Sequence, residues 1–286
     1  MNSFRLLFVI LLFAACNTVD FNDIAPEPDE PQAGSGNLTL RVKQLQQAPF
    51  ATDTSSTHVN FAFYDLGGTR VKQVNQKLGD NNYGTANVQL DPGTYQMVVL
   101  VHSSDRNPTM TNLAKIQFTN AYRYTETFMH YELITVTDQP QAFDLTLDRI
   151  VSLCRFVISD SIPDGVTQIR FQYTGGSGHF SAITGLGVTK STQVVTRQVK
   201  PGQRYQVIDL YTFLHQEKGT IELTATALNT AGEEQCTREF QISMAQNQIT
   251  WFTGNFFTDE KATGQWRVTP KIALDKNWGN EVFKYY

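Results

Sequence analysis

Alternation of apolar and polar residues, repeated along most of the chain, limits the folds open to this sequence more than any other feature. Leu38, Leu40 and Val42 alternate with polar residues, and the same period of two returns at 59–63 and 221–227. Successive side chains of a strand point to opposite faces, so this period predicts strands with one buried face. No segment carries the spacing of a long amphipathic helix. We therefore expect an all-β protein.

Turn sequences separate these strands at short intervals. Asp91-Pro92-Gly93 and Lys200-Pro201-Gly202 each place proline and glycine where a tight turn needs them. Residues 95–101 form a nearly continuous apolar run, as expected for a strand in the middle of a sandwich. Residues 113–134 fit no strand pattern, and we expect a helix or an irregular insertion there. Short strands joined by such turns are typical of β-sandwiches.

The two halves of the chain share sequence patterns. The sequence VNFAFYDLGG at 59–68 is similar to IRFQYTGG at 169–176, and DPGTYQMVV at 91–99 is similar to KPGQRYQVI at 200–208. A chain of 286 residues also suits two domains. We therefore predict two tandem sandwiches, an N-terminal one over 37–148 and a C-terminal one over 149–286.

The N-terminus reads as an export signal that ends in a cysteine. Arg5 precedes an apolar run at 6–13, which is too short to span a bilayer and suits a signal peptide. Small residues at 14 and 15 lead to Cys16, an arrangement that resembles the lipobox of bacterial lipoproteins. We predict a signal peptide over 1–15, a lipid on Cys16, and an extended acidic, proline-rich tether over 16–36.

Two further cysteines remain once Cys16 is assigned to the lipid. Cys154 and Cys236 each share the parity of neighbouring apolar residues, so both are expected to face the core of the second sandwich. In an oxidising compartment such a pair often forms a disulfide. Parity does not bring two sulphurs within bonding distance, and two separate buried thiols are the alternative.

Catalytic, metal-binding and nucleic-acid-binding patterns are missing from the sequence. The five histidines include no pair at zinc-ligand spacing. Ser177 lies in a Gly-Gly-Ser-Gly sequence without the following helix of a nucleophile elbow. A formal net charge of −4 gives no reason to bind phosphate backbones. We expect no catalytic residues, no metal site and no cofactor, and therefore no enzyme.

Several ordered motifs resemble one family. They are Cys16 with its acidic tether, LDPGTY at 90–95, LDRIV at 147–151 and ITWFTGNFF at 249–257. Over about 240 residues this order is similar to FimB-like anchor and accessory subunits of fimbrillin-type (type V) pili. The resemblance implies two transthyretin-like, Greek-key sandwiches on an outward-facing outer-membrane lipoprotein. Such a protein anchors the pilus shaft and limits its growth.

The resemblance also implies partners. These would be pilus shaft subunits, reached by strand exchange or edge pairing, and the outer membrane, reached through the lipid on Cys16. Related shaft subunits lose an N-terminal strand to an Arg-specific protease, and Arg41, inside the first predicted strand, is the candidate position for such a cut here. A shaft or tip subunit is therefore one alternative function. A glycan-binding surface lipoprotein is the other, with these aromatic candidates: Trp251, Trp266, Trp278, Tyr285 and Tyr286.

Overall fold

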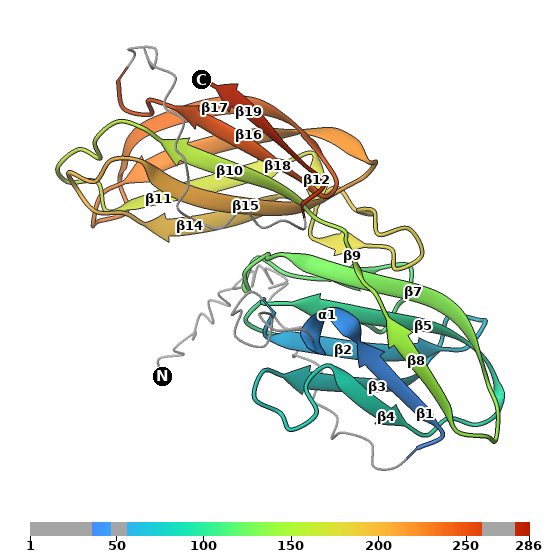
Figure 1. The fold of residues 1–286 in the computed structure, drawn as a ribbon. Coiled ribbons are helices and arrows are strands. Elements are labelled where there is room, and N and C mark those ends of the chain that lie inside the picture. The colour runs from blue at the N-terminus through green and yellow to red at the C-terminus, as the bar shows by residue number, and fades with distance from the viewer. Residues whose placement is uncertain (1–35, 47–55, 259–277) are drawn as a thin grey trace, which may run out of the picture.

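A computed structural model describes residues 36–46, 56–258 and 278–286. Nearly all of the regular structure is strand, and the helix α1 (Lys43–Gln46) has four residues. Within the described ranges, no helix has the length and apolar character needed to cross a membrane. Figure 1 shows two stacked bodies of strands, one coloured blue to green and the other yellow-green to red. The predicted all-β sandwich fold is confirmed.

The first sandwich packs a three-stranded sheet against a five-stranded one. The small sheet has the order β4-β1-β8 and the large sheet β3-β2-β5-β7-β9. Their bounds are β1 (Leu38–Val42), β2 (His58–Tyr64), β3 (Arg70–Lys77), β4 (Thr85–Val88), β5 (Gly93–His102), β7 (Thr127–Val136), β8 (Gln141–Leu145) and β9 (Asp148–Arg149).

The second sandwich has sheets of five and four strands. Their orders are β12-β15-β10-β18-β19 and β14-β11-β16-β17. The bounds are β10 (Ser152–Ile158), β11 (Gln168–Thr174), β12 (Gly176–Ser177), β14 (Gln193–Gln198), β15 (Gln206–Leu214), β16 (Lys218–Leu228), β17 (Glu234–Ala245), β18 (Gln248–Gly254) and β19 (Asn280–Tyr285). Two short strands, β6 (Ile116–Gln117) and β13 (His179–Phe180), pair with each other and link the sandwiches.

The two sandwiches repeat one strand plan. β1 pairs antiparallel with β4 and parallel with β8, and β10 does the same with β15 and β18. The chain of antiparallel pairs β3-β2-β5-β7 recurs as β14-β11-β16-β17. The motif at 59–68 therefore matches that at 169–176, on β2 and β11. The second sequence match is wrong, because 91–99 opens β5, whereas 200–208 opens β15, the counterpart of β4. Pro-Gly turns are common enough between strands to occur at unrelated positions.

Each sandwich encloses its own apolar core. Fully buried aromatic side chains lie in both, Phe61 and Phe63 in the first and Phe156 and Phe171 in the second. The run at 95–101 is apolar on both faces because β5 is the middle strand of its sheet and an apolar cluster covers each face of it. Its odd-numbered residues face the first core, and Val98 and Leu100 face a third cluster between the sandwiches.

The expectation for residues 113–134 is correct only in part. Residues 103–126 are irregular apart from β6, but β7 begins at Thr127 and runs to Val136. Met129 packs in the cluster between the sandwiches, whereas Ile134 and Val136 pack in the first core. Because the buried side changes along this strand, the simple alternation is lost from its sequence.

Candidate functional site

The segment that joins β5 to β7, residues 103–126, contacts both sandwiches, and we call it the junction segment. The hydroxyl of Tyr64 on β2 donates a hydrogen bond to the carbonyl oxygen of Met110. On the other side, the ring of Phe118 stacks on Phe180 and Phe213 of the second sandwich, with centroid distances of 6.4 and 5.9 Å. These residues belong to one buried apolar cluster that spans the junction.

Main-chain hydrogen bonds reinforce this contact. The Phe118 amide donates to the carbonyl oxygen of Gly178 at 3.0 Å. The Asn120 side chain donates to the Thr192 carbonyl oxygen at 3.0 Å and accepts from the Val194 amide at 3.1 Å. The second sandwich is thus attached to the junction segment through directional bonds as well as apolar packing.

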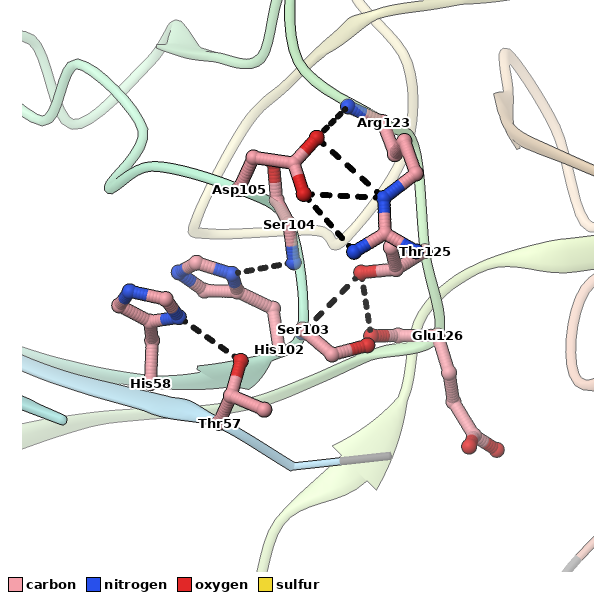
Figure 2. A network of polar contacts seen from close by, with 9 residues as sticks. All are labelled: Thr57, His58, His102, Ser103, Ser104, Asp105, Arg123, Thr125 and Glu126. Atoms are coloured by element: carbon pink, nitrogen blue, oxygen red, sulfur yellow. Dashed lines mark hydrogen bonds and ion pairs between the residues drawn. The ribbon is translucent and has the colours of Figure 1, made fainter. Parts of the chain in front are cut away.

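A buried pair of histidines lies where the junction segment leaves the first sandwich. His58 at the start of β2 is the cross-strand partner of His102 at the end of β5. Their rings stack with centroids 5.1 Å apart and planes 1° from parallel. Figure 2 shows the two rings side by side, with the Ser104 amide beside His102. The His102 side chain is fully buried and His58 nearly so.

The hydrogen bonds of His102 assign its tautomer. The Ser104 amide donates to its Nδ1 at 3.1 Å, and an amide nitrogen can only donate. The ring proton is therefore on Nε2, which donates to Asn60 Oδ1 at 3.0 Å. Burial lowers the pKa of His102 well below its ordinary value, and the charge of His58 lowers it further. The neutral ring has both nitrogens in use.

Buried amide side chains extend this polar layer across the sheet. Asn60 donates through Nδ2 to Asn75 at 2.9 Å and to Asn107 of the junction segment at 2.8 Å. Gln73 also donates to the Asn75 side-chain oxygen, at 2.8 Å. Buried polar groups need such partners, so the layer fixes the position of the junction segment on the sheet.

An ion pair closes the junction segment on itself. Arg123 contacts the Asp105 carboxylate through Nε and Nη2 at 3.0 and 2.8 Å, and the Ser103 amide donates to the Thr125 hydroxyl at 3.1 Å. Figure 2 shows these contacts beside the histidine pair. The hydrogen bond from Arg123 lowers the pKa of Asp105. The two ends of the segment are thereby held together.

Arg149 forms a second set of buried contacts between the sandwiches, separate from those of the junction segment. Its guanidinium pairs with Glu126, and the two side chains are 1% and 10% exposed. It also donates to Asn247 Oδ1 at 3.2 Å and lies over the rings of Phe128 and Trp278, at 4.5 and 4.0 Å from their centroids. One cation thus connects β7 and β9 with the turn before β18 and the chain before β19.

The described residues include no cluster of three metal-ligating side chains. Ser177 is fully buried on β12, and its hydroxyl donates to the His179 carbonyl oxygen at 2.7 Å. That hydroxyl also accepts the His179 amide at 3.0 Å. It therefore acts within the local backbone structure rather than facing a substrate.

The predicted lipidation site, Cys16, and the predicted protease site, Arg41, differ in whether the structure describes them. Cys16 and the tether lie outside the described residues. Arg41 lies in β1, where it is opposite Thr85 of β4 on one side and Asp144 of β8 on the other. Its guanidinium is 3.6 Å from the Asp144 carboxylate. A protease that cuts at Arg41 would have to bind a strand that is paired along both edges.

Cys154 and Cys236 both contact the second core, as their parity predicts. They lie on opposite sheets, on β10 and β17, and both are free thiols in the structure. The sulphur of Cys236 is 3.9 Å from the carbonyl oxygen of Phe256. In the structure the two thiols are separate, as in the alternative to a disulfide given above. The disulfide itself stays a prediction that chemical analysis of the protein can test.

Most of the aromatic candidates for glycan stacking that the structure describes are buried or packed against other side chains. Trp251 is 4% exposed, Trp278 contacts Arg149, and Tyr286 packs on Phe156 in the second core. Trp266 lies outside the described residues. Among the described candidates, only Tyr285 is largely exposed to solvent, at 61%.

The terminal strand β19 forms one edge of the second sandwich. No described strand pairs with its outer edge. A groove of about 480 Å³ separates it from the β16–β17 hairpin, and Lys218, Met244, Val282 and Lys284 are among the lining residues. An unpaired edge of this kind can accept a strand from another chain.

A family model matches residues 42–285, which is most of the chain. The family is described as a family of unknown function, DUF6562. The chain belongs to DUF6562. None of the curated proteins matches this DUF6562 protein.

Solved structures with similar folds include a candidate adhesin and two fimbrial proteins. A candidate adhesin from Bacteroides ovatus has a TM-score of 0.48 at 17% identity, over 75% of this chain and 84% of that one. A fimbrial assembly protein from Parabacteroides distasonis has 0.38 at 12%, over 79% and 91%. The fimbrial anchor protein Mfa2 from Porphyromonas gingivalis has 0.41 at 9%, over 70% and 80%.

Sequence reasoning missed the main polar features of this DUF6562 protein. His58 and His102 are 44 positions apart, so no local spacing reveals that they stack. The only signal was that His102 directly follows the apolar run at 95–101, in a strand expected to be covered on both faces. Arg149 was noted as part of a motif, but nothing in the sequence shows that it connects the sandwiches.

Proposed function

We propose that this DUF6562 protein is an outer-membrane lipoprotein that anchors a fimbrillin-type pilus at the cell surface and limits its length. The lipobox-like sequence that ends at Cys16 supports attachment to a membrane. The order of the motifs at 90–95, 147–151 and 249–257 supports membership of the pilus system. We keep the division into domains at 37–148 and 149–286, and the absence of enzyme activity, as parts of this proposal.

The position of β1 is the observation that favours an anchor over a shaft subunit. The predicted tether leads directly into β1, which is the middle strand of its sheet. Leu38, Leu40 and Val42 of β1 are at most 1% exposed in the first core. Removal of β1 after Arg41 would therefore open the core and separate β4 from β8 until a strand from another subunit filled the gap. A strand built in this way suits a protein that keeps its N-terminus and transmits load to a lipid.

Contact with pilus shaft subunits would use an unpaired sheet edge. Edge strands expose main-chain donors and acceptors that a partner strand can satisfy. The edge at β19 is open among the described strands, and two lysines line the groove beside it. We propose edge pairing or strand exchange as the mode of contact.

Metabolic labelling with an alkyne fatty acid tests the lipid. In the native bacterium, we expect label on the wild-type protein and on the control variant Cys236→Ala, and none on Cys16→Ala. Label retained by Cys16→Ala would overturn the assignment of the lipid. N-terminal sequencing of the mature protein separates the alternatives, because a start after Arg41 would indicate a shaft subunit.

Electron microscopy of the same strains tests the anchor. Cells that produce Cys16→Ala should release pili into the medium, and deletion of the gene should give longer pili. Pili that stay attached at normal length in an unlabelled Cys16→Ala strain would contradict the anchor and leave the lipoprotein assignment intact.

A further inference from the structure

The His58–His102 pair occupies the point where the junction segment meets the first sandwich. His102 accepts the Ser104 amide at Nδ1 and donates to Asn60 from Nε2, so its neutral form satisfies both neighbours. A second ring proton would be on Nδ1 and would face the Ser104 amide, which is also a donor. The charge would lie in a fully buried position against a second imidazole 5.1 Å away.

We propose that the stacked pair His58–His102 makes docking of the junction segment, and through it the contact between the two sandwiches, sensitive to acid. Protonation of His102 requires Ser104 to leave Nδ1. Ser104 lies at the start of the junction segment, so loss of its hydrogen bond to His102 releases this part of the segment from the His102 ring.

In the part of the chain that the structure describes, the charged side chains around the pair either have the sign of a protonated histidine or are paired with an arginine. Lys77 on β3 is the cross-strand partner of His58 and has the same sign. In the junction segment, Asp105 is paired with Arg123, and Glu126 is paired with Arg149. From β7, Thr127 is opposite His102 and is uncharged. Among the described residues, the carboxylates of Asp105 and Glu126 thus each have an arginine partner.

The same segment carries the contacts that hold the second sandwich. Phe118 packs edge-on against the His102 ring at 5.2 Å and stacks on Phe180 and Phe213 on its other side. The strand β6 in this segment pairs with β13 of the second sandwich. Release of the segment at His102 therefore weakens the attachment of the second sandwich to the first.

The direction of the pH effect follows from proton linkage. Burial and the charge of His58 lower the pKa of docked His102, whereas the released residue returns to an ordinary pKa of about 6.5. The docked state binds fewer protons, so docking is complete above pH of about 6.5 and weakens below it. While the docked His102 ring stays neutral, the docking equilibrium changes about tenfold for each pH unit below about 6.5, which amounts to about thirtyfold between pH 7.5 and 5.0.

Amide hydrogen exchange of the full protein at pH 7.5 and 5.0 measures this change. Protection factors, corrected for intrinsic exchange, should fall about thirtyfold for amides at 104–118. Amides of β16 inside the second sandwich serve as the internal reference and should change less than threefold. His102→Gln keeps one acceptor and one donor and cannot be charged, so its junction segment should lose no more than about threefold. His130→Gln, at a partly exposed histidine of β7, should behave as wild type.

NMR titration of the wild-type histidines gives a second readout that needs no variant. The His102 ring signals should show no titration between pH 8 and 6 while the segment is docked. The proposal is overturned if His102 titrates near pH 6.5 with the segment still protected, or if wild-type protection at 104–118 changes less than threefold. It is also overturned if His102→Gln folds and retains the thirtyfold loss.

Discussion

Replacing Arg149 by methionine should be among the most damaging single changes outside the two cores. The Arg149 side chain is 1% exposed, and its guanidinium is the cation beside the buried carboxylate of Glu126. Breaking a buried ion pair from one side leaves a desolvated charge and costs about 3–5 kcal/mol. The lost contacts with the rings of Phe128 and Trp278 are part of this cost. We expect Arg149→Met to lower the free energy of unfolding by about 4 kcal/mol.

A double variant separates the charge from the packing. Methionine in place of Arg149 together with glutamine in place of Glu126 removes both charges and keeps similar volumes. Because the double variant leaves no unpaired charge in the buried site, it should recover at least about 2 kcal/mol relative to Arg149→Met. Arg170→Met is the matched control, since its ion pair with Glu234 is 40% and 62% exposed and should cost about 1 kcal/mol or less.

Urea unfolding of the purified proteins at pH 7, followed by circular dichroism, measures these free energies. Amide exchange in β7 and β18 should show that the loss is centred on the contact between the sandwiches. A cost below about 1 kcal/mol for Arg149→Met would refute the assignment of a buried structural charge. A double variant that costs as much as Arg149→Met and Glu126→Gln added together would refute the coupling between Arg149 and Glu126.

Three further experiments test local features. Gly175→Ala should cost about 3 kcal/mol or more, because φ is +87° and the new Cβ would lie 2.2 Å from a backbone oxygen; Gly202→Ala has φ of +76° and open space, and thermal unfolding should show a cost of about 1 kcal/mol. Asp160→Ala removes the carboxylate that accepts the backbone amides of residues 256–258 at 2.7–2.9 Å, and should cost about 2–3 kcal/mol in urea unfolding and speed exchange of those amides. Alkylation of native protein, followed by mass spectrometry, should modify half-buried Cys236 well before Cys154, because burial raises the pKa of the Cys154 thiol. Equal rates would show that the core around Cys154 opens. No reaction without reductant would show a disulfide.

Local sequence determined where most of the strands lie. The alternation over 38–42 and 221–227 predicted β1 and β16, and the run at 95–101 correctly predicted a central strand. These strands could be read because their burial depends on the period of two and on nearby turns. β19 was not predicted, since its six residues are mostly exposed and carry no apolar alternation.

Long-range pairing decided the features that the sequence left open. Whether 91–99 corresponds to 200–208 depended on which strands became neighbours, and the sheet order showed that it does not. Cys154, His102 and Arg149 likewise each have a partner more than 40 residues away, namely Thr250, His58 and Asn247. The sequence by itself determined an all-β chain with two sandwich-like halves, because strand formation and turns are local. Only the tertiary structure decided how the halves join, because buried histidines and ion pairs are defined by the distant groups that surround them.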